Sequence, residues 1–194
     1  PQNRLYELAL RLQKLGVEVS VLTAITNYPH KRQNDSYRNK RYIHENMEGI
    51  DVHRAWIYVP KSKSILKRLL NYFSFVYTSF WTGWRRLKKA DFLLVESPPL
   101  FLGMTAVRLA RLKKAKMIFN VSDLWPESAE KLNLVNNKFF LKMSYRLEAR
   151  LYRKSAFITG QTQGIVKSIH DRFPDKTVYW LRNGVDLNFF NPGI

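Results

Sequence analysis

Apolar and polar positions alternate along the chain with two different periods. Apolar residues at helical spacing predict helices over residues 5–15, 66–84, 100–112, 137–154 and 164–172. Short apolar runs between them predict strands over residues 17–23, 50–58, 92–95, 117–121, 156–159 and 177–181. Gly16 suits the end of the first helix, and the polar stretch of residues 27–46 is predicted to be a long loop.

The regular alternation of helices and strands predicts the fold class. Apolar strands joined by amphipathic helices are typical of right-handed crossovers in an α/β fold with a doubly wound, mostly parallel, Rossmann-like sheet. A chain of 194 residues suffices for one such domain, which we place at residues 1–182. Asn183-Gly184 fits either a tight turn or a hinge over residues 183–194, and we favour the hinge because no further strand follows.

Composition narrows the classes of function. The chain has no cysteine, which excludes disulfides and thiolate chemistry, and its four histidines match no zinc spacing, so we expect no metal. A net charge of +18 indicates an anionic partner: nucleic acid, acidic lipid or a phosphate-bearing substrate. The chain starts at Pro1 in a helical pattern without a signal peptide, and we expect it to be a trimmed piece.

Polar and aromatic residues follow most of the predicted strands. Ligands of open α/β sheets bind beyond the carboxyl ends of the strands, so these segments are candidate binding segments. They comprise residues 26–29, 96–99, 122–128, 160–164 and 182–186. The sequence therefore predicts one polar edge of the sheet as the functional site.

The segment after the fourth predicted strand contains the clearest chemical pattern. Asp123 and Glu127 flank Trp125-Pro126, and an aromatic ring beside two carboxylates can hold a sugar by its apolar face and its hydroxyls. An equally weighted interpretation is structural: Asp123 and Glu127 cap a helix that begins near Pro126, and Trp125 packs in the core. The sequence leaves both interpretations open.

Taken together, these motifs resemble the family 4 glycosyltransferases, and most closely those of the bacterial surface-polysaccharide type that make colanic acid and O-antigen. The similarity covers nearly the whole chain, and the matching motifs occur in the family's order and spacing. The motifs are Asn3–Leu8, Val19–Thr23, Asn27–Pro29, Ser122–Glu127 and Asn183–Asp186.

This resemblance implies the amino-terminal, acceptor-binding half of a two-domain GT-B enzyme. The donor-binding domain would follow the hinge, so we expect this piece alone to be inactive. The implied reaction retains the anomeric configuration, needs no metal or cofactor, and moves a hexosyl or N-acetylhexosaminyl group from a nucleotide-sugar to a polyprenyl-diphosphate-linked saccharide. By position, Asp123 and its neighbours match the place where family members set an acidic or histidine residue against the donor sugar, and we take Asp123 and Glu127 as the candidate catalytic residues. From the strand ends and the long loop, the candidate substrate-binding residues are Asn27, Tyr28, Tyr37, Arg38, Glu96, Ser97, Trp125, Arg182, Asn183 and Asp186.

The predicted helix over residues 66–84 has two interpretations. Its apolar stripe suits a buried helix, but its many aromatic residues and the basic clusters at both ends also suit an anionic membrane surface. We favour the membrane and expect contacts from Phe73, Phe80, Trp81 and Trp84. Location in the cytoplasm, peripheral to the inner face of the plasma membrane, follows from this interpretation. The longest charge-free stretch, residues 69–84, is too short to span a bilayer.

The alternative function is a basic Rossmann-like module without catalysis that binds a membrane or nucleic acid. The basic residues are spread over helix ends and form no recognition helix or aromatic RNA-binding sheet, so we expect no nucleic-acid partner.

Overall fold

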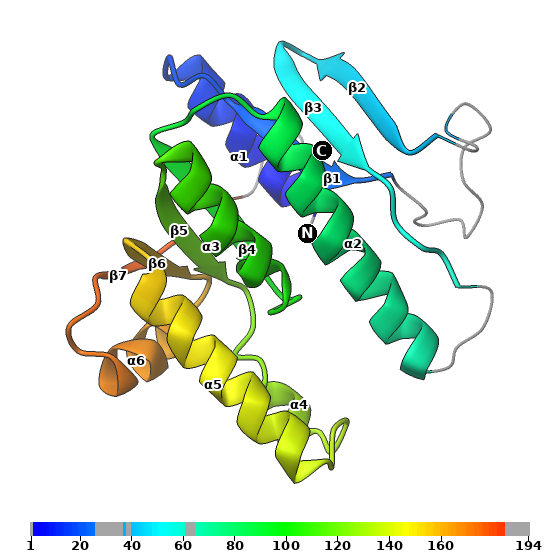
Figure 1. Cartoon of the computed structure of the whole chain (residues 1–194). Coiled ribbons are helices and arrows are strands. Elements are labelled where there is room, and N and C mark those ends of the chain that lie inside the picture. The colour runs from blue at the N-terminus through cyan, green and yellow to red at the C-terminus, as the bar shows by residue number, and fades with distance from the viewer. Residues whose placement is uncertain (1, 26–36, 38–39, 61–64, 185–194) are drawn as a thin grey trace, which may run out of the picture.

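The computed structural model describes residues 2–25, 37, 40–60 and 65–184, and its arrangement is shown in Figure 1. The helices are α1 (Gln2–Lys14), α2 (Ile65–Arg86), α3 (Leu102–Lys113), α4 (Glu127–Lys131), α5 (Lys138–Lys154) and α6 (Gln163–Arg172). The strands are β1 (Ser20–Ala24), β2 (Tyr42–Met47), β3 (Ile50–Ala55), β4 (Phe92–Ser97), β5 (Lys116–Val121), β6 (Phe157–Gly160) and β7 (Val178–Trp180).

The strands form two sheets. One has the order β1-β3-β2, and the other has the order β4-β5-β6-β7 with every neighbouring pair parallel. Helices connect these parallel strands, as right-handed crossovers require. The predicted α/β, Rossmann-like fold class is therefore confirmed.

Strand β2 was not predicted, because residues 42–46 were assigned to the long loop. It pairs antiparallel with β3 through a two-residue turn at Glu48 and Gly49, both with positive φ (51° and 87°). Two consecutive residues with a left-handed backbone conformation are the usual turn of a tight β-hairpin. β2 lies at an edge of its sheet and has two exposed polar residues, His44 and Asn46, so it lacks the apolar run by which the other strands were recognised. The remainder of the predicted loop lies mostly outside the described residues.

Helices α2, α3 and α5 cover one face of the strands, side by side (Figure 1). Two glycines allow this close packing. A Cβ on Gly83 of α2 would lie 2.6 Å from Leu109 Cδ1 of α3, and a Cβ on Gly103 of α3 would lie 2.5 Å from Leu151 Cδ1 of α5. Real side chains do not approach so closely, so each glycine fixes the spacing of two helices.

The main core lies between α3, α5 and the four-stranded sheet. Its buried members include Phe119 and Val121 on β5, Leu151 and Tyr152 on α5, and Ile158 on β6. A smaller core joins α1 to the first sheet through Ala9, Ile50 and Val52. Within the described part of the chain, no helix combines the length and hydropathy needed to cross a bilayer.

Substitution of Gly103 by alanine tests this packing. Alanine normally stabilises a helix relative to glycine, but here its methyl group would overlap Leu151 and Phe119, which are both buried. We expect Gly103→Ala to lower the free energy of unfolding in urea by about 1 to 3 kcal/mol.

Gly164 provides the matched control, because its added Cβ would meet no atom closer than Thr162 Oγ1 at 3.8 Å. Gly164→Ala should leave the free energy of unfolding unchanged or raise it by less than about 1 kcal/mol. A Gly103→Ala protein as stable as the unsubstituted chain would contradict the close contact between α3 and α5.

Candidate functional site

The carboxyl ends of β4 and β5 lie next to each other. Ser97 pairs with Val121 in the parallel register, and the backbone N–H of Ser122 donates to the carbonyl oxygen of Ser97 at 2.9 Å. Glu96 and Asp123 therefore come from neighbouring strands at the same edge of the sheet. This is the edge at which the sequence predicted a binding site.

An ion pair between Arg4 and Glu96 occupies the centre of this edge. Arg4 Nη2 donates to Glu96 Oε1 at 2.6 Å, and the two side chains are only 17% and 16% exposed. The other carboxylate oxygen of Glu96 accepts from the amide of Asn120, whose own oxygen accepts from Thr159 Oγ1 at 2.6 Å. Polar side chains thus connect α1, β4, β5 and β6 along one line.

Gln161 extends the network past the end of β6. Its carboxamide oxygen, turned toward Arg4, accepts from Arg4 Nη1 at 2.5 Å and from Ser122 Oγ at 2.5 Å. The opposite orientation would set amide N–H groups against the guanidinium donors, so we adopt this one. Trp180 Nε1 donates to the Gln161 backbone oxygen at 3.1 Å, and the Arg182 guanidinium lies 4.9 Å from the centre of the Trp180 ring.

The local environment changes the acidity of Glu96. Burial raises the pKa of its carboxyl group, and the hydrogen bond from Asn120 and the charge of Arg4 oppose that effect only in part. A carboxyl group of raised pKa among converging polar groups is typical of functional sites. The edge therefore combines a polar network with a perturbed acid.

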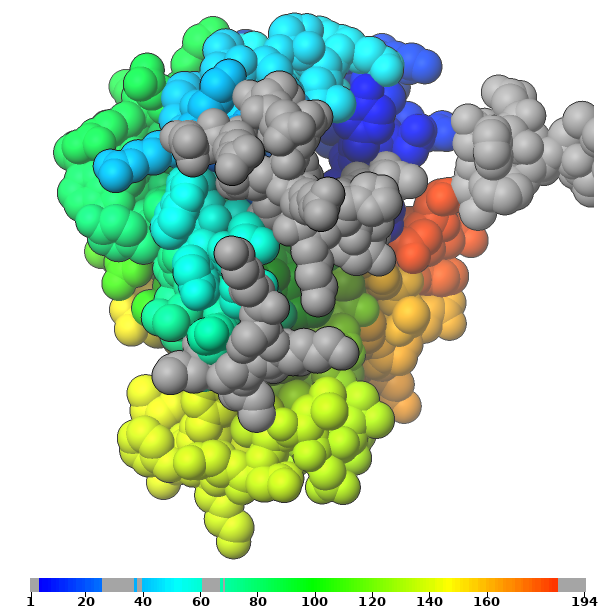
Figure 2. All heavy atoms as spheres, turned by 90° about the vertical axis from the view of Figure 1, so that its right-hand side faces the viewer, coloured from blue at the N-terminus to red at the C-terminus, as the bar shows by residue number. Residues whose placement is uncertain are grey.

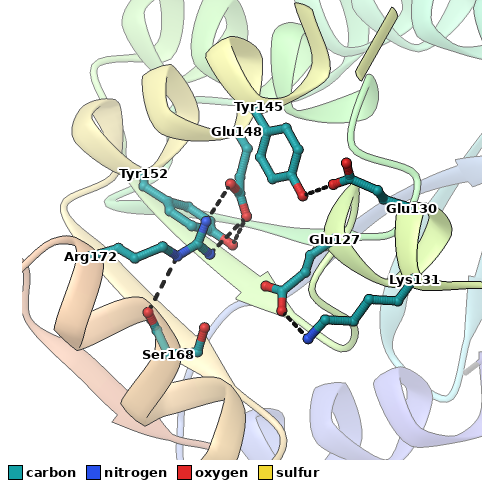
Figure 3. A network of polar contacts seen from close by, with 8 residues as sticks. All are labelled: Glu127, Glu130, Lys131, Tyr145, Glu148, Tyr152, Ser168 and Arg172. Carbon is teal, nitrogen blue, oxygen red and sulfur yellow. Dashed lines mark hydrogen bonds and ion pairs between the residues drawn. The ribbon is translucent and has the colours of Figure 1, made fainter. Parts of the chain in front are cut away.

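Asp123 and Glu127 have different partners. The exposed Asp123 accepts a hydrogen bond from Ser128 Oγ at 2.9 Å. Glu127 forms an ion pair with Lys131 on the same short helix, at 2.5 Å (Figure 3). The N-cap of α4 is Pro126, without a side-chain hydrogen bond, so neither carboxylate has the predicted capping role. Asp123 keeps one carboxylate oxygen, Oδ1, without a recorded protein partner among the described residues.

Trp125 packs in an aromatic cluster beside this segment, as the structural interpretation expected. Its ring lies edge-on to Phe101 at 5.8 Å and to Phe140 at 6.2 Å between ring centres. Phe101 also contacts Phe73 of α2 at 5.0 Å. We call Phe73, Phe101, Trp125 and Phe140 the aromatic cluster; it joins α2 and α5 to the segments that lead into α3 and α4. Trp125 remains half-buried, so part of its surface is accessible.

The other predicted site residues are distributed more widely. Arg182 and Asn183 are exposed at the same edge, whereas the Ser97 side chain is buried. Tyr37 Oη donates to Glu45 Oε2 of β2 at 3.0 Å, and this hydrogen bond, followed by burial, raises the pKa of Tyr37. Asn27, Tyr28, Arg38 and Asp186 lie outside the described residues.

Two polar residues at this edge, Arg4 and Asn120, were not predicted as site residues, and Gln161 was predicted only as part of the candidate binding segment 160–164. Asn120 interrupts the apolar strand 116–121, and a polar residue in such a position needs a buried partner, which is a readable signal. Arg4 gives no comparable signal, since the residues it contacts are 92 and 118 positions away along the chain.

A second polar network fastens α6 to α5 (Figure 3). The buried carboxylate of Glu148 accepts from Arg172 Nη1 at 2.9 Å and Nη2 at 3.1 Å, and from Tyr152 Oη at 3.0 Å. Burial, followed by the Glu148 charge, raises the pKa of Tyr152. In the same view Tyr145 Oη donates to Glu130 at 2.5 Å, and burial followed by that hydrogen bond raises the pKa of Tyr145 to about 12. Tyr152 and Tyr145 therefore stay protonated and act as donors.

Metal binding finds no support in the described residues, among which no three histidine, aspartate or glutamate side chains are grouped to hold an ion.

The pH dependence of stability tests the environment of Glu96. A pKa raised above its ordinary 4.5 means that the folded protein keeps this proton to higher pH than the unfolded chain. The resulting stabilisation is complete below the ordinary value and is lost as the pH rises through the raised folded-state pKa. In urea titrations from about pH 4 to about pH 7, we therefore expect the unsubstituted protein to lose stability relative to Glu96→Gln.

Glu7→Gln, at an exposed position of α1, serves as the control and should follow the unsubstituted protein across this range. The opposite result would contradict this description of Glu96: the free energy of unfolding of the unsubstituted protein would rise relative to that of Glu96→Gln as the pH increases. That result would mean that Arg4 and Asn120 outweigh burial.

Comparison with known proteins identifies the family. Residues 1–183 match the family model described as "Glycosyl transferase 4-like domain". Over 110 residues the chain is 37% identical to the "Putative colanic acid biosynthesis glycosyl transferase WcaI" of Escherichia coli (strain K12). That alignment covers 56% of this chain and 26% of the relative, so the chain matches about a quarter of the relative's length. Because the family model covers nearly all of its residues, the chain belongs to the glycosyl transferase 4-like family.

Proposed function

We propose that the whole protein is a retaining glycosyltransferase of surface-polysaccharide biosynthesis. It transfers a hexosyl or N-acetylhexosaminyl group from a nucleotide-sugar to a lipid-linked saccharide, and this domain binds the acceptor. Family membership supports the reaction class, and the name of the relative supports the pathway. The single observation that carries the proposal is the polar carboxyl edge, where Glu96 and Asp123 end neighbouring strands beside Arg4 and Gln161.

The chemistry of this edge suits a saccharide and its phosphates. Carboxylates accept hydrogen bonds from sugar hydroxyls, and the exposed Arg182 can donate to a phosphate. Among the described residues, no side chain or backbone group donates to Asp123 Oδ1, whereas both oxygens of Glu96 already have partners. Glu96 therefore positions the edge, and Asp123 makes the direct contact.

Asp123 also suits the electrostatics of the reaction. Breaking the bond between a sugar and its phosphate develops positive charge on the sugar ring. A carboxylate held against that ring stabilises the charge without becoming a nucleophile or a base. The ion pair of Glu127 with Lys131 gives Glu127 the weaker case for such a contact.

Helix α2 supports a membrane-bound acceptor. It packs on α3 through small residues, with Ser79 buried and Gly83 against Leu109, while Thr105 Oγ1 donates to the Val76 carbonyl oxygen at 2.7 Å. The predicted apolar stripe is therefore only partly buried. Its exposed members include Leu70, Phe73, Tyr77 and Trp84, with Tyr77 65% exposed.

The predicted membrane contacts on α2 differ in accessibility. Phe73 and Trp84 are exposed, whereas Phe80 and Trp81 are half-buried and stack edge-on at 5.6 Å. Arg85 lies over the Trp81 and Trp84 rings, at 5.2 and 5.8 Å. Aromatic rings beside cationic groups suit a membrane interface. We place the protein in the cytoplasm, peripheral to the inner face of the plasma membrane.

Transfer assays with the whole protein test the proposed function. A panel of radiolabelled nucleotide-sugars is incubated in detergent with polyprenyl-diphosphate-linked saccharides, and label is counted in the extracted lipid. We expect transfer with retention of configuration, measured by NMR of the product. Asp123→Asn should lower kcat/KM by about 100-fold, because it removes the charge that faces the sugar ring.

Asp91→Asn is the matched control, since Asp91 is exposed just before β4, at the opposite edge of the sheet. It should change kcat/KM by less than about twofold, as expected of a remote surface position. Absence of transfer from every donor, or equal effects of the two substitutions, would overturn the proposal and favour a non-catalytic basic module.

A further inference from the structure

The outer face of α5 has an unusual composition. Residues 131–154 include seven basic side chains and a single acidic one, Glu148. Glu148 is buried and paired with Arg172, so it contributes no exposed negative charge. The exposed side chains of α5 are all basic or apolar: Lys138, Phe139, Lys142, Met143, Arg146, Arg150, Arg153 and Lys154.

Large apolar side chains are exposed where α4 leads into α5. Phe139 is 74% exposed, Leu134 is 71% exposed, and Leu132 is similarly accessible. Asn133 between the two leucines has a positive φ of 53°, so the chain turns sharply there. We call these three side chains, Leu132, Leu134 and Phe139, the apolar corner. In Figure 2 the region of α4 and the start of α5 protrudes as a lobe from the lower end of the molecule.

A basic groove runs along α5 from this corner. It is open, has a volume of about 740 Å³, and is lined by Lys138, Lys142, Arg146 and Arg153. Its one acidic side chain, Glu130, accepts the hydrogen bond from Tyr145. Four cationic groups in a groove of this size match a phosphate-bearing headgroup.

The apolar corner and the basic groove together favour a membrane over nucleic acids and acidic proteins as the partner. Nucleic acids and acidic proteins would satisfy the basic groove but would leave Leu132, Leu134 and Phe139 in water or against polar backbone. A bilayer with anionic headgroups accepts both, since apolar side chains enter the interface and lysines and arginines stay among the phosphates.

The position of the corner agrees with this choice. Phe140, adjacent to Phe139 in sequence, contacts Phe101, which contacts Phe73 of α2. Both α2 and α5 begin at the carboxyl edge of the strands, where the candidate site lies. A membrane against the corner therefore continues onto the exposed side of α2 near its amino-terminal end.

We infer that the apolar corner and the basic groove of α5 form a docking surface for an anionic membrane, in addition to the aromatic residues predicted on α2. Leu132, Leu134 and Phe139 insert between headgroups, and the groove holds an anionic lipid headgroup. The inference deepens the proposed function, on which its biological role rests, by naming the element that orients the acceptor site toward the bilayer.

Vesicle co-sedimentation tests the docking surface. The chain is mixed with phosphatidylcholine vesicles that contain or lack phosphatidylglycerol, at low and high salt. The groove variant combines Lys138→Gln, Lys142→Gln and Arg146→Gln, and the corner variant combines Leu132→Ser, Leu134→Ser and Phe139→Ser. All six side chains are exposed, so both variants should fold, which circular dichroism and urea unfolding verify.

The matched control neutralises three exposed lysines elsewhere, Lys14, Lys89 and Lys167, by glutamine. We expect partitioning onto anionic vesicles to fall about 100-fold in the groove variant. The control should change it by less than about fivefold, because its lysines lie on α1, just after α2 and on α6, outside the apolar corner and the groove. The corner variant should lose about tenfold or more, chiefly at high salt, where apolar insertion carries the binding.

Equal loss of binding in the groove variant and the control would overturn the inference. So would binding that both α5 variants retain and that Tyr77→Ser combined with Trp84→Ser abolishes. Binding of duplex DNA, but not of vesicles, that is lost in the groove variant would also overturn it. The sugar-transfer assay in detergent contains no vesicles. Failure of the docking surface would therefore leave transfer in that assay intact, whereas failure of the proposed function would abolish it.

Discussion

The ion pair of Arg4 with Glu96 joins the two sheets of this domain at their carboxyl edge. Helix α1 packs on the first sheet through Ala9, yet its first turn reaches across to the end of β4 in the second sheet. Among the described residues, the paired strands alone leave the two sheets separate. Removing either partner would leave an isolated charge in a mostly buried place, which is costly. The geometry of the polar edge therefore depends on a contact between residues 92 positions apart.

The helices and the parallel strands could be predicted from the sequence because apolar residues recur at a regular spacing in the helices and form short continuous runs in the strands. The sequence failed to predict β2, whose exposed His44 and Asn46 conceal the strand, although the turn at Glu48-Gly49 was a usable signal. It predicted the polar edge from the ends of strands, including Glu96 and Asp123. It did not find Arg4, because pairing across sheets leaves no mark on local periodicity.

The aromatic residues show why composition alone left two interpretations open. Trp125 and Phe140 look alike in sequence to Trp84 and Phe139, yet the first two meet within the aromatic cluster and the last two face outward. On α2, the buried positions are taken by small residues, Ser79 and Gly83, the second of which lies against Leu109 of α3, while the larger Trp84 stays exposed. Whether an aromatic side chain is buried depends on which other element packs against it, and the sequence alone does not give that neighbour.

The ion pair of Glu148 and Arg172 constrains how this sequence can evolve, because the Glu148 side chain is only 1% exposed while that of Arg172 is 33% exposed. Loss of Arg172 would leave the Glu148 charge in the interior without its ion-pair partner, at a cost of about 3 to 5 kcal/mol. Loss of Glu148 would leave only a partly exposed arginine, so sequences that change Glu148 first, or both positions together, should be the more frequent ones. Among the described residues, the exposed basic side chains of α5 form no ion pair of this kind, so substitutions there can occur one position at a time.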